Sequence, residues 1–169
     1  NIFLSPEMKS TGEVIGFDSQ LGSAYAKAEI GAGVQLPSKG KIFISINDSD
    51  KNDIVVIARD FNEMNFQIIA TEGTSKLLNQ NGIKCENIFK VGEGRPHIID
   101  EIKNNKIDFI INTPLGAQSR YDEHIIGTAA IKHKIPVITT ISAAKAAVRA
   151  IRTMKSGVFS YQSLQEIFN

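Results

Sequence analysis

This chain has little cysteine, no long hydrophobic run and almost no excess of charge. Cys85 is the single cysteine among 169 residues, which excludes an internal disulfide and favours a reducing, cytoplasmic location. No apolar run approaches about 18 residues, so we expect no membrane span, and no signal peptide is evident. The formal net charge of +1 disfavours a broad nucleic-acid surface, which needs clustered lysine and arginine. We therefore expect neither a membrane nor a nucleic acid as a partner.

Groups that commonly carry catalysis or hold metals are also sparse. The three histidines are scattered and the cysteine is single, so no zinc-ligand spacing occurs and we predict no metal site. No Ser–His–Asp or Cys–His arrangement stands in a recognisable context, and the phosphate loop GxxxxGK is absent. The chain has anion donors but no evident acid–base pair. This combination favours binding over turnover, and we predict no catalytic residue.

Glycine and proline breakers divide the chain into parts. Residues 31–40 hold four of them in ten positions, which is typical of a linker. This linker separates a leader, residues 1–30, from a compact domain that we assign to residues 41–169. Because the chain starts at Asn1 and opens with a polar, irregular segment, we expect it to be a piece of a longer polypeptide.

Short β-rich runs alternate with amphipathic stretches through the main domain. The predicted strands are Lys41–Ile46, Phe66–Ala70, Glu86–Lys90, Phe109–Asn112 and Val137–Thr140, and helices are predicted within residues 54–64, 75–80, 98–102, 122–133 and 142–152. This alternation predicts an α/β, doubly wound, five-stranded and mainly parallel sheet with helices on both faces, as in Rossmann-like and flavodoxin-like folds. We expect Asp122 and Ser142 to cap their helices and Pro96 to lie in the first turn of the third.

Polar residues follow each predicted strand, and parallel strands all end at one edge of a sheet, where ligands bind. Hydroxyls, amides and lysines dominate these loops, and carboxylates are few. The sharpest pattern is Thr71-Glu-Gly-Thr74 at the start of a helix. Two hydroxyls and free N–H groups can meet an anion there, and Gly73 permits close approach. Lys51 and Lys90 can add full charge, so we predict a phosphate site.

The run Lys90-Val-Gly-Glu-Gly-Arg-Pro-His97 combines glycines, cations and a proline in a way suited to binding a small anion. Arg95 and His97 are therefore candidates for an effector loop. Simpler interpretations stay open for each of these patterns. Residues 71–74 can serve only as a helix cap, Lys51 can be a solvated lysine, and residues 92–97 can form a plain turn.

Longer phrases of the chain resemble the carbamoyl-phosphate synthase large-subunit family. Residues 5–16 (SPEMKSTGEVIG) resemble the closing segment of that subunit's second ATP-grasp unit, and residues 21–28 resemble the helix that follows it. The run from Ser45 to Arg152 resembles the C-terminal regulatory domain, which has a methylglyoxal-synthase-like fold. Its landmarks are residues 70–74 (ATEGT), 90–97 (KVGEGRPH), 110–116 (IINTPLG) and 138–140 (ITT). The resemblance covers nearly the whole chain.

The resemblance implies that the chain is part of an ATP-dependent ligase that makes carbamoyl phosphate for pyrimidine and arginine synthesis. The full enzyme would use ATP, Mg or Mn, and K, together with a glutaminase small subunit. The regulatory domain itself would need no cofactor and do no chemistry. It would bind a phosphorylated effector: UMP, IMP or phosphoribosyl pyrophosphate.

The resemblance also implies which residues contact the effector. The matching positions are Lys51, Thr71, Thr74, Lys90 and Asn112. A further contact, often threonine, falls on Pro114, which has no side-chain donor, and Thr113 could substitute for it. Thr139 matches a threonine of ornithine-responsive members, but the tyrosine that those members carry two residues earlier is Val137 here, which disfavours ornithine activation.

Two other functions remain as alternatives. A stand-alone lyase of the methylglyoxal-synthase type would act on dihydroxyacetone phosphate. That enzyme needs a catalytic aspartate in a Gly-Gly-Asp context after the third strand, where this chain has Gly94-Arg-Pro-His97. A domain that mainly mediates self-association of the large subunit is the third possibility.

Overall fold

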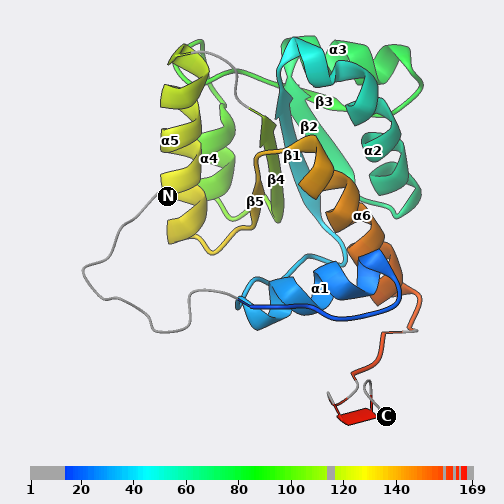
Figure 1. The fold of residues 1–169 in the computed structure, drawn as a ribbon. Helices are drawn as coiled ribbons and strands as arrows, with labels where there is room; N and C mark the ends of the chain where they lie inside the picture. The colour runs from blue at the N-terminus through cyan, green and yellow to red at the C-terminus, as the bar shows by residue number, and fades with distance from the viewer. Residues whose placement is uncertain (1–13, 114–116, 158, 162, 164, 167–169) are drawn as a thin grey trace.

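A computed structural model describes residues 14–113, 117–157, 159–161, 163 and 165–166. For residues 117–120 it describes the helix but not the side chains. Five parallel strands form one sheet (Figure 1). They are β1 (Lys41–Ile46), β2 (Gln67–Thr71), β3 (Glu86–Ile88), β4 (Phe109–Thr113) and β5 (Val137–Ile138), and their order is β3-β2-β1-β4-β5. This order confirms the predicted α/β, doubly wound, parallel sheet.

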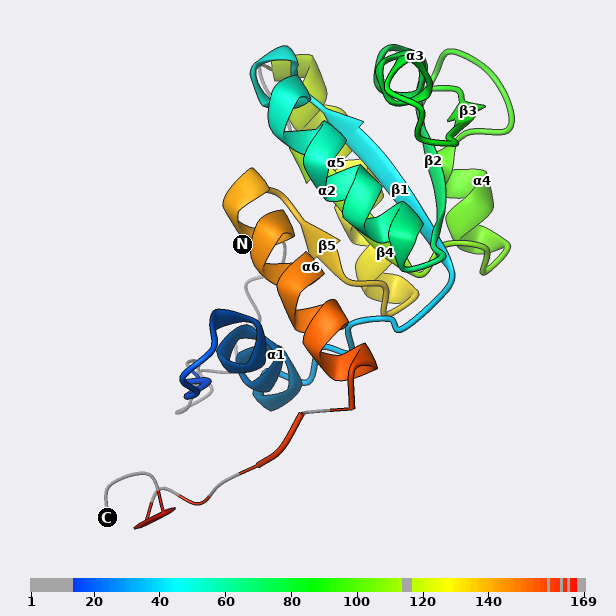
Figure 2. The same ribbon diagram turned by 90° about the vertical axis from the view of Figure 1, so that its right-hand side faces the viewer.

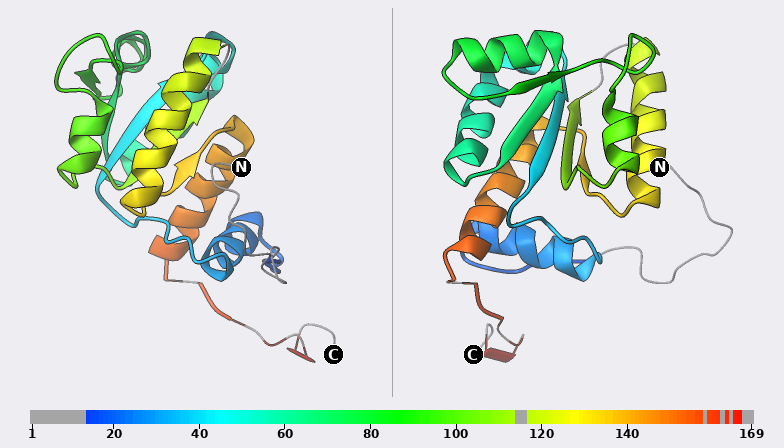
Figure 3. Two further views of the ribbon diagram at one scale, coloured as in Figure 1. Left: turned by 90° about the vertical axis from the view of Figure 1, so that its left-hand side faces the viewer. Right: turned by 180° about the vertical axis from the view of Figure 1, so that it is seen from behind.

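Helices cover both faces of the sheet. They are α1 (Leu21–Gly31), α2 (Lys51–Glu63), α3 (Glu72–Gln80), α4 (Ile98–Lys103), α5 (Ala117–Lys132) and α6 (Ile141–Lys155), with a short 3₁₀ helix, η1 (Asp48–Asp50), before α2. Helices α4 and α5 lie on one face, whereas α2, α3 and α6 lie on the other (Figures 1 and 3). Within the described part of the chain, no helix is both long enough and apolar enough to cross a membrane.

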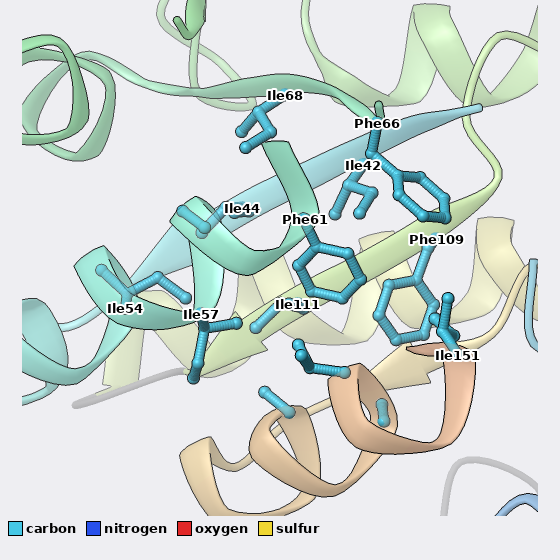
Figure 4. Packing of buried hydrophobic residues seen from close by; sticks show 14 of the residues in the cluster. Ile42, Ile44, Ile54, Ile57, Phe61, Phe66, Ile68, Phe109, Ile111 and Ile151 are labelled. Carbon is cyan, nitrogen blue, oxygen red and sulfur yellow. The ribbon is translucent and has the colours of Figure 1, made fainter. Parts of the chain in front are cut away.

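The alternation of side chains along each strand divides the core in two. In β1, Ile42 and Ile44 join the cluster under α2 and α6, and Phe43 joins the cluster under α4 and α5. Phe61 of α2 packs against Phe109 of β4, with ring centroids 5.9 Å apart (Figure 4). Each fully buried side chain of this size contributes about 1.5–3 kcal/mol relative to exposure. The two layers therefore hold the strand ends in fixed relative positions.

Helix α1, from the leader, packs closely against α6 (Figure 2). A Cβ atom on Gly22 would lie 2.8 Å from both the backbone oxygen of Arg149 and Oγ1 of Thr153, so only glycine fits at this crossing. From the linker at residues 31–40 we would expect the leader, once separated from a neighbouring domain, to be loosely held, and for α1 this expectation is wrong. Residues 1–13, which contain most of the ATP-grasp-like phrase, lie outside the described residues. The assignment of residues 1–30 to a neighbouring domain stays a prediction.

Several predicted helix starts are wrong. Helix α5 begins at Ala117, so Asp122 lies inside the helix and is not its cap. Thr140, not Ser142, caps α6, because its Oγ1 accepts a hydrogen bond of 3.2 Å from the N–H of Ala143. Helix α4 begins at Ile98, after Pro96.

The predicted ends of two strands also need correction. The third predicted strand, Glu86–Lys90, ends at Ile88, and the fifth, Val137–Thr140, ends at Ile138. The two predicted segments therefore extend beyond the last residues that pair with a neighbouring strand, Ile88 and Ile138. Lys90 and Thr139 therefore lie in loops beyond the sheet.

Candidate ligand-binding cleft

A cleft of about 540 Å³ opens at the edge of the sheet where the strands end, which we call the carboxyl edge. The ends of β1, β2 and β4 form its floor, and the loop after β3 together with α4 and α5 forms its walls. From β1 the chain continues to β2 and β3 on one side of the sheet, and then to β4 and β5 on the other side of β1. The cleft therefore lies at the point where the strand order reverses, the usual ligand position in doubly wound sheets.

Three polar side chains reach the floor because of strand alternation. Ser45, Thr71 and Asn112 each follow by two positions a core residue on the face that α4 and α5 cover. Ser45 and Asn112 are partners in the parallel register. One face of the sheet thus changes from apolar to polar at the carboxyl edge.

Two of these floor residues are buried and unpartnered. Thr71 is 7% exposed and Asn112 is 6% exposed. Within the described residues, neither side chain has a hydrogen-bond partner. Thr71 stands at the N-cap position of α3, yet its hydroxyl does not cap the helix. Neither side chain is fully enclosed: among the described residues, the buried side-chain atom without a hydrogen-bond partner is Nδ1 of His97. Because the Thr71 hydroxyl and the Asn112 amide line the cleft and bond to no protein group, they remain available to a polar ligand.

Thr113 has a different role from Asn112. Its Oγ1 accepts hydrogen bonds from the backbone N–H of Asn47 at 3.3 Å and from Asn47 Nδ2 at 3.2 Å. Asn47 Nδ2 also donates to the carbonyl oxygen of Thr113 at 3.3 Å. These bonds join the loop after β1 to the end of β4. The hydroxyl proton of Thr113 remains available as a donor to the cleft.

The charged lining is mixed, although hydroxyls and amides outnumber the carboxylates in the cleft. Lys90 lines the cleft together with Glu93 and Asp122. Lys90 Nζ lies 4.0 Å from Glu93 Oε1, and the two side chains are 56% and 59% exposed. Asp122, on α5, has no ion-pair partner among the described residues. The cleft therefore offers both a cation and free carboxylate acceptors.

The remaining wall is apolar. Phe43 of β1, Ile98 of α4 and Ile126 of α5 line it, and all three belong to the second core cluster. Val91, in the loop after β3, packs against the same cluster. This wall can contact an uncharged ring or chain while the floor meets polar groups.

Lys51 lies beside the cleft without lining it. It is the first residue of α2, and its Nζ lies 2.6 Å from Oδ1 of Asp48. The pKa of Asp48 lies below its ordinary value because Lys51 bonds to it and, to a smaller extent, because the charge of Lys90 is near. The two predicted lysines therefore flank the same carboxylate at the carboxyl edge.

Thr74 and Gly73 lie in the first turn of α3 rather than on the cleft surface. Thr74 is buried, and it is absent from the cleft lining. Gly73 is exposed, and a Cβ atom built on it would meet nothing within 4 Å, so its backbone is not closely approached by other protein atoms. These two residues can reach a ligand through the backbone N–H groups that open a helix.

Arg95, His97 and Thr139 do not line the cleft. Arg95 is 80% exposed, and its Nη1 lies 3.7 Å from Oδ1 of Asp100. The backbone N–H of His97 donates to Oδ2 of Asp100 at 3.1 Å, and this bond lowers the pKa of Asp100. Thr139 lines a separate hollow beside β5 that also includes Tyr25 of α1. The structure thus gives Arg95 and His97 contacts at the start of α4 instead. Pro114 lies outside the described residues.

Four polar side chains that line the cleft were not among the predicted site residues: Ser45, Asn47, Glu93 and Asp122. The alternation in KIFISI places Ser45 on the same face as Phe43, which was a usable signal. No comparable signal pointed to Asp122. Because the sequence predicted a helix starting at residue 122, we interpreted Asp122 as a helix cap and not as a residue of the site.

Comparisons with known proteins agree with this architecture. The family described as the MGS-like domain matches residues 53–139. A carbamoyl phosphate synthase large chain from Nostoc sp. is 48% identical over 163 residues, covering 96% of this chain but 15% of the relative. The protein titled carbamoyl phosphate synthase large chain, C-terminal section, from Methanopyrus kandleri is 49% identical, covering 97% of this chain and 30% of the relative. The chain thus spans a minor part of the relatives it matches.

A solved structure supports the fold. The methylglyoxal synthase from Elizabethkingia anophelis superimposes with a TM-score of 0.54, covering 70% of this chain and 82% of the synthase. The two sequences are 19% identical, so this likeness concerns the arrangement of the elements alone.

Proposed function

Because this chain belongs to the family of MGS-like domains, we propose that it is the allosteric effector-binding domain of a carbamoyl phosphate synthase large chain. Its cleft would bind a phosphorylated nucleotide such as UMP or IMP. The observation that carries this proposal is the pair of buried, unpartnered polar side chains at the floor, Thr71 and Asn112. Both side chains line the cleft, so a polar ligand could hydrogen-bond to both without displacing a protein partner.

The phosphate would lie over the start of α3. The Thr71 hydroxyl, the Asn112 amide and the backbone N–H groups of Gly73 and Thr74 are donors at this place, and the helix dipole favours an anion there. Lys90 would add a charge-assisted bond from the wall of the cleft. Phosphoribosyl pyrophosphate offers the same chemistry and is a third candidate.

The nucleoside would lie along the remaining lining. The Asp122 carboxylate can accept hydrogen bonds from ribose hydroxyls, and it has no competing partner among the described residues. The apolar wall of Phe43, Ile98 and Ile126 can contact the base. A carboxylate in an anion site is unfavourable for the phosphate itself, which is a reason to assign the two ends of the ligand to different parts of the cleft.

The rest of the enzyme would supply the chemistry. The proposal implies a cytoplasmic ligase for pyrimidine and arginine synthesis with ATP, Mg or Mn, and K, a glutaminase small subunit, and catalytic sites outside this chain. Effector binding would then bias the distant ATP sites by about 1–3 kcal/mol, the usual range of allosteric coupling. Self-association through this domain is compatible with that role.

Lys90→Ala tests the site directly. We expect the dissociation constant for UMP or IMP, measured by calorimetry, to rise about three- to tenfold, because the phosphate loses one charge-assisted bond at a half-exposed position. Lys84→Ala removes the same charge from an exposed position before β3 and outside the cleft lining, and should leave the affinity unchanged. Equal affinities for wild type and Lys90→Ala would contradict the assignment of Lys90.

The lyase alternative is favoured by one observation, the presence of Glu93 and Asp122 in the cleft, since a carboxylate can act as a general base. Release of inorganic phosphate from dihydroxyacetone phosphate decides between the two functions. Turnover that Asp122→Asn abolishes would replace the regulatory proposal. Tight binding of a nucleotide without turnover would support it.

A further inference from the structure

Lys51, which opens α2, is already engaged by an anion of the chain itself. Its Nζ lies 2.6 Å from Oδ1 of Asp48, three residues earlier, and the two side chains are 36% and 91% exposed. A pair this close is a charge-assisted hydrogen bond, although water screens it. One of the three N–H donors of Lys51 is therefore directed at Asp48 and its charge is partly compensated, so a phosphate that binds Lys51 has to compete with that carboxylate.

The loop that carries Asp48 is anchored to the floor of the cleft. Asn47 Oδ1 accepts hydrogen bonds from the N–H groups of Ser49 at 2.9 Å and Asp50 at 3.2 Å, which starts η1. Asn47 is in turn bonded to Thr113 at the end of β4. The backbone on either side of Asp48 is thus tied to the strands that form the cleft, which places the Asp48 side chain within reach of Lys51.

Lys90 also lies within electrostatic range of Asp48. Its charge contributes to the lowered pKa of that carboxylate, after the larger contribution of Lys51. Lys90 has a carboxylate of its own nearby, since its Nζ lies 4.0 Å from Glu93 Oε1. Both lysines predicted to meet phosphate therefore have an internal carboxylate three residues away, and the Lys51–Asp48 pair is the closer of the two.

We propose that Asp48 is a built-in competitor of the effector, and that it sets the affinity of the site by occupying Lys51. This inference rests on the proposed function. When the phosphate arrives, the Lys51–Asp48 bond breaks, a Lys51–phosphate bond forms, and the Asp48 carboxylate turns into water. Because Asp48 is 91% exposed, its release leaves no buried charge behind, and the penalty is the loss of one surface ion pair. A pair of this kind corresponds to a change of about 1.5- to 5-fold in affinity.

Asp48→Asn is the decisive variant, because it keeps the shape of the side chain and removes its charge. At low ionic strength we expect its calorimetric dissociation constant for UMP or IMP to be about 1.5- to 5-fold lower than that of wild type. In a Lys51→Met background, Asp48→Asn should have almost no effect, because there is no lysine to release. The difference between the two backgrounds is the coupling that the inference requires. In about 0.5 M salt the advantage of Asp48→Asn should disappear, because the exposed pair is screened.

Glu72→Gln is the matched control. It removes a carboxylate from the first turn of α3, at the same carboxyl edge, and Glu72 has no ion-pair partner among the described residues. Any effect of Glu72→Gln should be smaller and should not depend on the identity of residue 51. This separates release of Lys51 from a general reduction of negative charge near the site.

The outcomes separate the inference from the function on which it rests. If wild type binds and Asp48→Asn binds no tighter, or gains equally with Met at position 51, the inference is overturned and the proposed function stands. If Asp48→Asn binds and wild type does not, the competitor role is supported. If neither protein binds UMP, IMP or phosphoribosyl pyrophosphate, the proposed function and the inference are overturned together.

Discussion

Replacing Asn112 by leucine should make the protein more stable while it abolishes effector binding. Asn112 is 6% exposed, lies in β4 beside the central strand β1, and has no hydrogen-bond partner for its side chain within the described residues. Leucine is apolar, removes the unpartnered amide, and has room to extend into a cleft of about 540 Å³. The variant therefore removes a cost from the folded state and a donor from the site.

The magnitude follows from the burial of the amide. An unsatisfied buried polar group costs about 1–3 kcal/mol. The polar atoms of Asn112 line the open cleft, where water can bond to them, so we expect the gain to be at most about 1 kcal/mol. For a chain of this size, about 1 kcal/mol corresponds to a rise of about 2–4 °C in the melting temperature. Wild type, in contrast, should gain stability from saturating UMP or IMP by mass action, and the variant should not.

Thermal unfolding with and without ligand measures both effects in one experiment. Asn79→Leu is the control, because the Asn79 amide donates to the carbonyl oxygens of Ser75 and Cys85, each at 2.9 Å. Losing those bonds should lower the melting temperature. A lower melting temperature for ligand-free Asn112→Leu would refute the argument that the cleft stores an unsatisfied group. Retention of the ligand-induced shift would refute its role in binding.

Two further predictions concern stability alone. Gly22→Ala should lower the free energy of unfolding by about 1–3 kcal/mol, because its new Cβ would lie 2.8 Å from the backbone oxygen of Arg149. Gly73→Ala is the control, because a Cβ there meets nothing within 4 Å, and chemical unfolding measures both variants. The pKa of Asp100 lies below the ordinary value of 3.8, chiefly because the backbone N–H of His97 donates to it, so its contribution to stability is present above about pH 4 and is lost as the pH falls through its folded-state pKa. Asp100→Asn should therefore flatten the loss of unfolding free energy in acid, and an unchanged slope between about pH 5 and pH 2 would contradict this assignment.

Local pattern was enough to predict most of the fold. The run Lys41–Ile46 was predicted with the observed bounds, and the alternation of β-rich and amphipathic segments predicted the doubly wound sheet. The predicted helix starts were wrong where the start depends on the geometry of the capping residue. Thr140 and Ser142 are both good caps by residue type, and only the backbone conformation at Thr140 decides between them.

The candidate site was predictable in part. Thr71 and Lys90 were named from their places after strands, and Asn112 and Thr113 from the family resemblance; the structure brings all four to one cleft. Lys51 lies at the same edge but binds Asp48, and Thr74 is buried in α3. Whether any of them contacts an effector stays a prediction. Residue type shows which atoms can donate, but it does not show which of them an internal carboxylate already occupies.

The amino-acid sequence alone determined the alternation of strands and helices, because side-chain periodicity depends on neighbours a few residues away. It also determined which residues lie just after each strand, and hence at the carboxyl edge. Only the tertiary structure decided that Asp122 of α5 and Lys90 line the same cleft, that the Asn112 amide bonds to no other described residue, and that Asp48 engages Lys51. Such facts depend on distances between segments far apart in the chain and on side-chain positions, and local periodicity carries no information about either.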